Sequence, residues 1–276
     1  MEYPFKIGSG ILPENRKEIF YEEPHEYLIM VGGGSTYGAK WGGNDAIPTA
    51  TTYILGSIDL TTGERTEGKT IFTWQITEEE YQKRIYAQYF KEGVKYRIKG
   101  FPSKKSSGFY PIEVLGTVNR MPFLDALWRD YLAPVFMHSE LFGEMELNKR
   151  YGYFHADFDW LGTEIEVSFN TDEEEDEKCL ANLEQFCREA ERRDKEVRDF
   201  AAEELTYLAN DWRDDDHLDH EITEEEFKTR IKISSVEMSA DGDYDVWFDD
   251  DDMFAGHSVH ISGDALDAPN YSAMEG

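Results

Sequence analysis

The sequence is short of basic residues, and this shortage narrows what the protein can be. It holds 28 Lys and Arg against 58 Asp and Glu, a net charge of −30 over 276 residues. Nucleic acids and anionic membranes repel such a chain, so we expect no direct nucleic-acid binding and no membrane association. No apolar run approaches the roughly 18 residues of a membrane span, and no secretion signal precedes the first predicted strand. We therefore expect a cytoplasmic protein.

Cysteine is almost absent, with only Cys179 and Cys187 present. Both fall in one predicted helix, where eight residues rise about 12 Å, too far for a disulfide. We expect them to be small, buried apolar residues.

Common catalytic patterns are also missing. The sequence has no serine elbow, no nucleophilic cysteine context and no HExxH pattern. The glycine-rich segment 32–43 lacks the Gly-Lys-Ser/Thr ending of a phosphate-binding loop, because Trp41 follows Lys40. We interpret it as a flexible surface loop. No cofactor and no catalytic residue can be assigned, and a non-enzymatic protein is favoured.

What is present is enough apolar sequence for real cores, and a sharp division of charge. Apolar residues make up 40% of the chain and aromatic residues 14%. Residues 1–140 contain 18 acidic and 16 basic residues, whereas residues 141–276 contain 40 and 12. Such asymmetry indicates two domains, which we place at residues 1–134 and 142–276, with the boundary after an amphipathic helix near residues 123–131.

The predicted fold class is α+β. The N-terminal domain is rich in β-branched and aromatic runs, which predict strands near residues 26–31, 52–60, 69–76, 94–101 and 109–118. A barrel-like or rolled sheet with one short helix from Thr77 fits this order. The C-terminal domain reads as two strands, three helices and three strands, forming an antiparallel sheet with helices on one face. Thr171 is the expected N-cap of a helical stretch over residues 173–212, which should break near residues 192–194.

Two segments repeat a helix-start pattern. Residues 76–85 and 222–231 share seven of ten identities, and each has a Thr followed three residues later by Glu. We predict a capping box at both, beginning at Thr77 and Thr223. Two well-made helix starts explain the match, and duplication of a subdomain is the alternative.

Acidic residues of the C-terminal domain gather at a helix start, in a loop and in a turn. These are Asp172, Glu173, Glu174 and Glu175; Asp214, Asp215 and Asp216; and Asp249, Asp250, Asp251 and Asp252. Carboxylates in a turn can hold Ca²⁺ or Mg²⁺, and His217 and His220 could add metal ligands in the loop. No EF-hand spacing is present, and consecutive residues in a tight turn rarely converge on one ion. We therefore predict no metal site.

Several short motifs of the C-terminal domain resemble the bacterial DUF2262 family of unknown function. They comprise Gly143, Leu147, Phe154, the turn at residues 159–162, Asn210, Asp211, Trp212, the helix start at residues 223–227, Asp250, Phe254, Gly256 and His257. The N-terminal half resembles the domain that often precedes this family. The resemblance implies no known activity. It makes Asn210, Asp211, Trp212, Asp250, Phe254, Gly256 and His257 the candidate binding residues.

Three functional hypotheses follow. The first is an interaction protein, of the immunity or inhibitor type, whose acidic C-terminal domain binds a protein partner with a basic surface. The second is a divalent-metal-dependent enzyme that uses the region of Asp250 and His257. The third is that the charge only keeps the protein soluble.

Overall fold

The computed structural model describes the chain except for residues 1, 35, 41–45, 173, 213–219 and 276. It divides into two compact units, Met1–Ala133 and Pro134–Gly276. The division falls at the proline that ends the amphipathic helix α2 (Pro122–Leu132). None of the helices formed by the described residues has the length and apolar content needed to cross a membrane.

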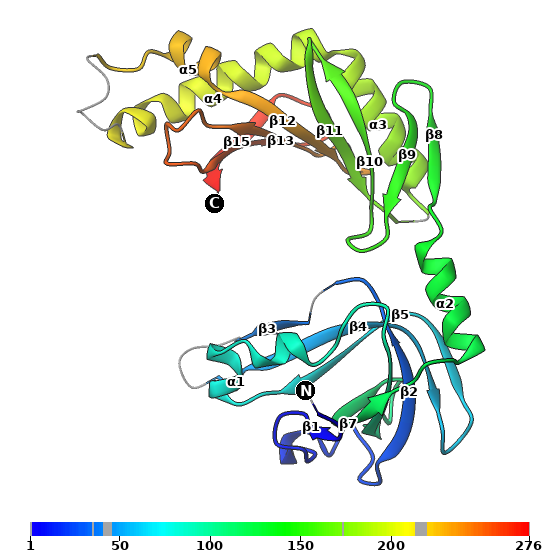
Figure 1. Ribbon diagram of the computed structural model, residues 1–276. Helices are drawn as coiled ribbons and strands as arrows, with labels where there is room; N and C mark the ends of the chain where they lie inside the picture. The colour runs from blue at the N-terminus through cyan, green and yellow to red at the C-terminus, as the bar shows by residue number, and fades with distance from the viewer. Residues whose placement is uncertain (1, 35, 41–45, 173, 213–219, 276) are drawn as a thin grey trace. The chain divides into compact units, whose positions relative to one another are not determined.

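The N-terminal unit is a curled antiparallel sheet (Figure 1), which agrees with the barrel-like or rolled sheet predicted from the sequence. Its strand order is β1-β7-β6-β2-β4-β3, and β5 also pairs with β4. The strands are β1 (Phe5–Lys6), β2 (His25–Val31), β3 (Tyr37–Ala39), β4 (Thr49–Asp59), β5 (Arg65–Gln75), β6 (Lys95–Pro102) and β7 (Phe109–Thr117). The helical pieces are η1 (Glu14–Arg16), α1 (Glu78–Gln82), η2 (Ile85–Gln88) and α2.

Helix α2 packs on the N-terminal sheet through Leu124, which is fully buried with Leu28, Met30 and Leu55. In the described residues of the glycine-rich segment, the surface loop that the sequence predicted is not found, because Gly33 packs against α2 and Tyr37–Ala39 form β3. Gly33 is buried, and a Cβ at this position would lie 1.7 Å from the hydroxyl oxygen of Tyr131. Glycine is needed there because the backbone lies directly against the side chain of Tyr131.

The C-terminal unit is an eight-stranded sheet in the order β15-β14-β13-β12-β11-β10-β9-β8. The strands are β8 (Phe136–Ser139), β9 (Gly143–Asn148), β10 (Tyr153–Trp160), β11 (Thr163–Asn170), β12 (Lys232–Met238), β13 (Tyr244–Asp249), β14 (Ser258–Gly263) and β15 (Pro269–Glu275). Strands β8, β9 and β15 were not predicted from the sequence.

One pairing corrects the prediction of a fully antiparallel sheet. β11 and β12 run parallel, with Val167 opposite Val236. Parallel neighbours require a long crossover connection. Here the crossover contains α3 (Asp176–Arg188), α4 (Ala190–Trp212) and α5 (Glu224–Arg230). These helices cover one face of the sheet, as predicted (Figure 1).

The first helix of the C-terminal unit, α3, begins later and ends earlier than its sequence pattern indicated. α3 starts at Asp176 because the buried carboxylate of Asp176 accepts the backbone N–H of Asp172 and the hydroxyl of Thr171. Thr171 is therefore not its N-cap. The break between α3 and α4 falls at Glu189 and not at residues 192–194. Both cysteines lie buried and unpaired on α3, as expected.

The two repeated helix starts are both capped, though differently. At α1 the capping box is complete, since Thr77 and Glu80 exchange side-chain to backbone hydrogen bonds. At α5 the Thr223 hydroxyl accepts the Glu226 N–H, but the Glu226 carboxylate contacts His220 at 2.9 Å. The second capping box is therefore only half formed.

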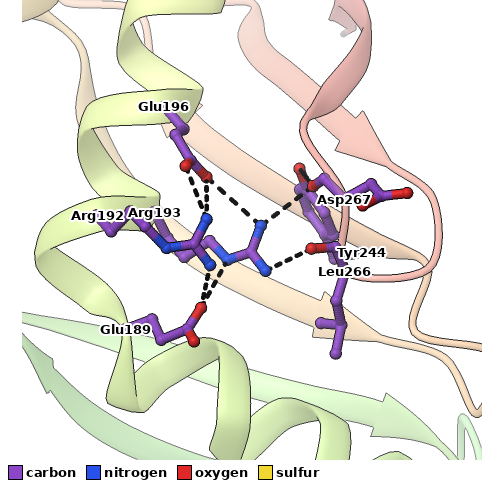
Figure 2. Close-up of polar contacts among 7 residues, drawn as sticks. All are labelled: Glu189, Arg192, Arg193, Glu196, Tyr244, Leu266 and Asp267. Carbon is purple, nitrogen blue, oxygen red and sulfur yellow. Dashed lines mark hydrogen bonds and ion pairs between the residues drawn. The ribbon is translucent and has the colours of Figure 1, made fainter.

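Arg193 of α4 holds the connection between β14 and β15 against the helices (Figure 2). Its guanidinium is 2% exposed and donates to the carbonyls of Asp267, at 3.1 Å, and Leu266. The rings of Phe186 and Tyr244 lie within cation–π range, and Glu189 and Glu196 balance its charge at 3.5 Å. This is a structural contact that fixes the last strand of the sheet.

Candidate functional site on the open sheet face

The face of the C-terminal sheet opposite the helices carries a dense set of acidic side chains. Val167, Val236 and Val246 are fully buried on the helix side. Because side chains alternate along a strand, their neighbours on each strand point to the other face. We call this the open face and define it by Glu146, His155, Asp157, Asp159, Glu164, Glu166, Ser168, Lys232, Ser235, Glu237, Asp245, Trp247, Asp249, His260, Tyr271 and Glu275. Lys232, which pairs with Asp249, is the one basic residue among them.

Strand register aligns these residues in two rows. One row runs from Glu146 through His155, Ser168, Glu237 and Asp245 to Ser262 and Tyr271. The second runs from Asp157 through Glu166, Ser235, Trp247 and His260 to Ala273. Neither row contains Lys or Arg. The rows place carboxylates side by side at two points, Glu237 with Asp245 in the first row and Asp157 with Glu166 in the second.

His260 lies on β14, the second strand from the β15 edge of the sheet, where it is 9% exposed and held by two carboxylates. Its Nε2 is 2.6 Å from Asp245 Oδ1, and its Nδ1 is 3.2 Å from Glu275 Oε1. Its ring stacks on Trp247 with centroids 4.1 Å apart, and Tyr271 meets it edge-on at 5.7 Å. The result is an aromatic surface surrounded by carboxylates.

The carboxylates are close enough to influence one another. Partial burial, followed by the neighbouring Asp245 carboxylate, raises the pKa of Glu237, while Asn170 and His260 oppose the rise. Asn170 Nδ2 donates to Glu237 Oε1. On the neighbouring strands His155 Nδ1 lies 3.4 Å from Glu166 Oε2. A cation arriving at this face would thus relieve repulsion that the fold already contains.

The candidate binding residues from the sequence do converge, but at a different place. Asn210 and Trp212 end α4, and Phe254, Gly256 and His257 lie in the β13–β14 connection. Trp212 meets His257 edge-on at 5.5 Å and Phe254 at 6.3 Å. Asn210 donates to the Ile222 carbonyl and accepts the Ile222 N–H, both at 2.8 Å. Asp211 is exposed beside them.

Asp250 organises the β13–β14 connection. Its buried carboxylate accepts backbone N–H groups from Asp252 at 3.1 Å, Phe254 at 2.7 Å and Gly256 at 3.2 Å. His257 Nδ1 contacts the Phe254 carbonyl at 2.6 Å. Both Asp250 oxygens are used by the backbone, so this corner does not present a free ligand pair. Within the part of the chain that the structure describes, no cluster of three potential metal ligands is found.

The three acidic patches predicted from the sequence differ from the open face. Asp172, Glu174 and Glu175 are exposed at the start of α3. Asp251 pairs with Arg230 at 3.0 Å, while Asp249 and Asp252 are exposed. Glu173, Asp214, Asp215, Asp216 and His217 lie outside the described residues. Of all these residues, only Asp249 belongs to the open face.

Sequence reasoning missed the open face although a signal was present. Asp157 and Asp159 alternate with Phe158 and Trp160, and Glu164 and Glu166 alternate with Ile165 and Val167. Period-two alternation of this kind places every acid of a strand on one side. The acidic patches were predicted from runs of consecutive acids instead, and such runs do not indicate one face of a strand.

Comparisons with known proteins match both units to families. Residues 139–273 match the family described as an uncharacterized protein conserved in bacteria, DUF2262, and residues 14–131 match DUF7021, a domain of unknown function. No curated protein matches the chain.

Among solved structures, two of the single-stranded DNA binding protein from Thermus aquaticus are similar, one of a deletion mutant that also carries an arginine-to-alanine substitution and one of the wild type. Each is 10% identical and covers 53% of this chain; the matches cover 75% and 73% of those chains, with TM-scores of 0.21 and 0.20. TM-scores this low do not indicate a shared fold.

Proposed function

Because the C-terminal unit belongs to the bacterial DUF2262 family, which has no assigned activity, and follows a DUF7021 domain, we propose a function from the open face itself. The protein is an interaction protein that binds a basic surface of another protein. The observation that carries this proposal is the pair of acid-rich rows, without Lys or Arg, around the Trp247–His260 stack.

Charge complementarity gives such a face two properties. It accelerates encounter with a basic partner, and this acceleration falls as salt screens the charges. Removing the repulsion between Glu237 and Asp245 adds a favourable term that exists only in the complex.

The Trp247–His260 stack adds an aromatic packing contact to the attraction between charges. Arg and Lys side chains pack over aromatic faces, and Trp is the strongest such ring. Aromatic residues near the centre of an interface commonly supply much of its binding energy. The open face thus combines an aromatic anchor with neighbouring carboxylates, a chemistry suited to an arginine-rich surface.

A nucleic-acid-binding protein is the partner class that fits this chemistry best. Its basic surface normally meets phosphates, and an array of carboxylates competes for the same groups. Binding would then inhibit the partner, which corresponds to the immunity or inhibitor type expected from the sequence.

The test is capture of partners from the native host by the full-length chain at low and high salt. The face variant carries Asp157→Asn, Glu166→Gln and Asp245→Asn. The matched control carries Glu177→Gln, Glu203→Gln and Glu204→Gln, which removes the same charge from exposed helix positions. We expect a basic protein that is retained by wild type and control, released by salt and lost by the face variant.

Two results would contradict the proposal. One is equal loss of the partner by both triple variants, which would mean that only total charge matters. The other is capture of nothing at either salt concentration, which would favour charge as a solubility device.

A further inference from the structure

The N-terminal unit contains a pocket of about 430 Å³ that the proposed interaction does not use. It lies where β2, β4 and the turn between β6 and β7 meet, with the start of β5 completing one wall. Pockets of roughly 300–1,000 Å³ are typical for small-molecule ligands. The side chains that matter for its chemistry are Glu23, His25, Tyr27, Asp59 and Glu64.

His25 and Asp59 form an ordered pair in this pocket. His25 Nδ1 lies 2.7 Å from Asp59 Oδ2, while Asp59 Oδ1 accepts the backbone N–H groups of Thr61 at 2.7 Å and Thr62 at 3.1 Å. Burial would raise the pKa of Asp59, but these hydrogen bonds outweigh it and lower that pKa. Asp59 is therefore a fixed carboxylate near neutral pH.

This carboxylate sets the chemistry of the imidazole. A neutral His25 that donates its Nδ1 proton to Asp59 has an acceptor lone pair on Nε2. Among the hydrogen bonds of the described residues, none involves Nε2 of His25. In the neutral form of the ring, the pocket therefore contains a nitrogen that can accept a hydrogen bond from a ligand.

Tyr27 forms the floor beside this pair. Its ring stacks on Phe109 with centroids 4.0 Å apart and planes 9° apart. Burial first, and then the Asp59 carboxylate, raise the pKa of Tyr27, so its phenol stays neutral. The stack on Phe109 positions the Tyr27 ring beside the His25–Asp59 pair.

Strand register separates Ser57 of the pocket from His25. Ser57 lies opposite Ile29, whereas Asp59 lies opposite Tyr27. His25 is four residues from Ile29 on the same strand, roughly 13 Å away along β2. Ser57 is thus out of reach of His25, and the pair does not form a nucleophilic triad with it. Ligand binding is the simpler use of the site.

The charge of the lining defines the ligand. Glu23, Asp59 and Glu64 supply three carboxylates, and the lining contains neither Lys nor Arg. No ion pair to Glu23 or Glu64 is found among residues that the structure describes. Lys104 lies 5.8 Å from the Tyr21 ring at the rim, but its ammonium donates to the Lys17 carbonyl. The pocket is rich in acceptors and suits a ligand rich in donors.

We propose that this pocket binds a small organic cation through an ammonium or guanidinium group. The Glu23 and Glu64 carboxylates and Nε2 of His25 accept its N–H groups, and Tyr27 packs against its apolar part.

Agmatine, which carries a guanidinium and an ammonium group, is a suitable probe for isothermal titration calorimetry on the full chain. A chain of net charge −30 attracts any cation weakly, so the controls must hold charge constant. Glu64→Gln removes one carboxylate from the pocket, and Glu67→Gln removes one from an exposed position of β5, three residues further along the chain. Citrate and glucose serve as anionic and neutral comparison ligands.

We expect agmatine to bind at one site, with Glu64→Gln weakening the affinity about fivefold or more and Glu67→Gln less than twofold. The NMR resonances of the His25 ring should shift on saturation, while citrate and glucose leave them unchanged. Equal weakening by the two variants, or His25 resonances that do not move, would overturn the proposal. Equal binding of citrate or glucose would overturn the cation assignment.

Discussion

The imidazole of His260 lies flat on the indole of Trp247, with ring centroids 4.1 Å apart and planes inclined by 8°. The imidazole edge is held by Asp245 and Glu275, so the stack is fixed in place before any partner arrives. A preformed aromatic surface needs little ordering on binding, which favours affinity.

Trp247→Ala should weaken binding of an arginine-rich peptide to the full chain. The loss of the indole removes the ring over which a guanidinium would pack and frees His260 from its stack. We expect about a fivefold rise in Kd at low salt, measured by fluorescence anisotropy of a labelled nona-arginine peptide. Tyr207→Ala, which removes an exposed aromatic from α4, should leave Kd unchanged. An equal rise for both variants would refute a role for the stack.

Glu237→Gln should stabilise the protein slightly at neutral pH. A carboxyl group whose pKa is raised by folding binds its proton more tightly in the native state than in the unfolded state. Its contribution to stability is therefore lost as pH rises from the ordinary value of Glu through the raised pKa. Because Glu237 is only half buried, we expect Tm to rise by on the order of 1 °C at pH 7.

That gain should disappear near pH 4, where Glu237 of the wild type is itself protonated. Scanning calorimetry at several pH values measures both outcomes. Glu203→Gln on α4 is the control, for which no such pH-dependent difference is expected. A stabilisation by Glu237→Gln that persists unchanged at pH 4 would argue against the electrostatic cause.

Asp250→Asn should destabilise the C-terminal unit by about 2 kcal/mol. The Asp250 carboxylate accepts three backbone N–H groups, and an amide in its place turns one acceptor into a donor. Urea unfolding followed by far-UV circular dichroism gives the change. Asp252→Asn, with the same chemical change at an exposed position of the same turn, should cost less than about 0.5 kcal/mol.

Arg193→Lys should loosen the last strand of the sheet. A lysine keeps the charge but cannot donate to the Leu266 and Asp267 carbonyls together in the planar geometry of guanidinium. Hydrogen exchange measured by mass spectrometry should show faster exchange across residues 264–275. Arg192→Lys, at an exposed neighbouring position that shares the acidic partners Glu189 and Glu196 with Arg193, should leave exchange there unchanged. Unaltered exchange in Arg193→Lys would show that the two carbonyl contacts do not hold β15.

Local patterns predicted much of this architecture. Alternating and β-branched runs located β2, β4, β5, β6 and β7, and turn residues located the hairpins. Leu161 and Gly162, both at positive φ, form the predicted turn between β10 and β11. These features are encoded within a few residues, so a single sequence is enough to find them.

Features that depend on distant residues were missed. The parallel pairing of β11 with β12 depends on where the crossover helices α3, α4 and α5 place the start of β12. The helix start at Asp176 depends on a side chain that turns back to residues 171 and 172. The stack of Trp247 on His260 depends on strand register. The His25–Asp59 pair joins residues 34 positions apart through the pairing of β2 with β4.

The single parallel pairing of the C-terminal sheet has a consequence for how the domain folds. On one side of it β8, β9, β10 and β11 follow one another as hairpin neighbours, and on the other side β12, β13, β14 and β15 do the same. Each group can assemble through short-range contacts, whereas joining β11 to β12 requires closing a loop over residues 171–231. We therefore expect the two antiparallel groups to form faster than the β11–β12 pairing that joins them. Both rows of the open face include residues on either side of the β11–β12 pairing, so the acidic surface is complete only when these two strands have paired.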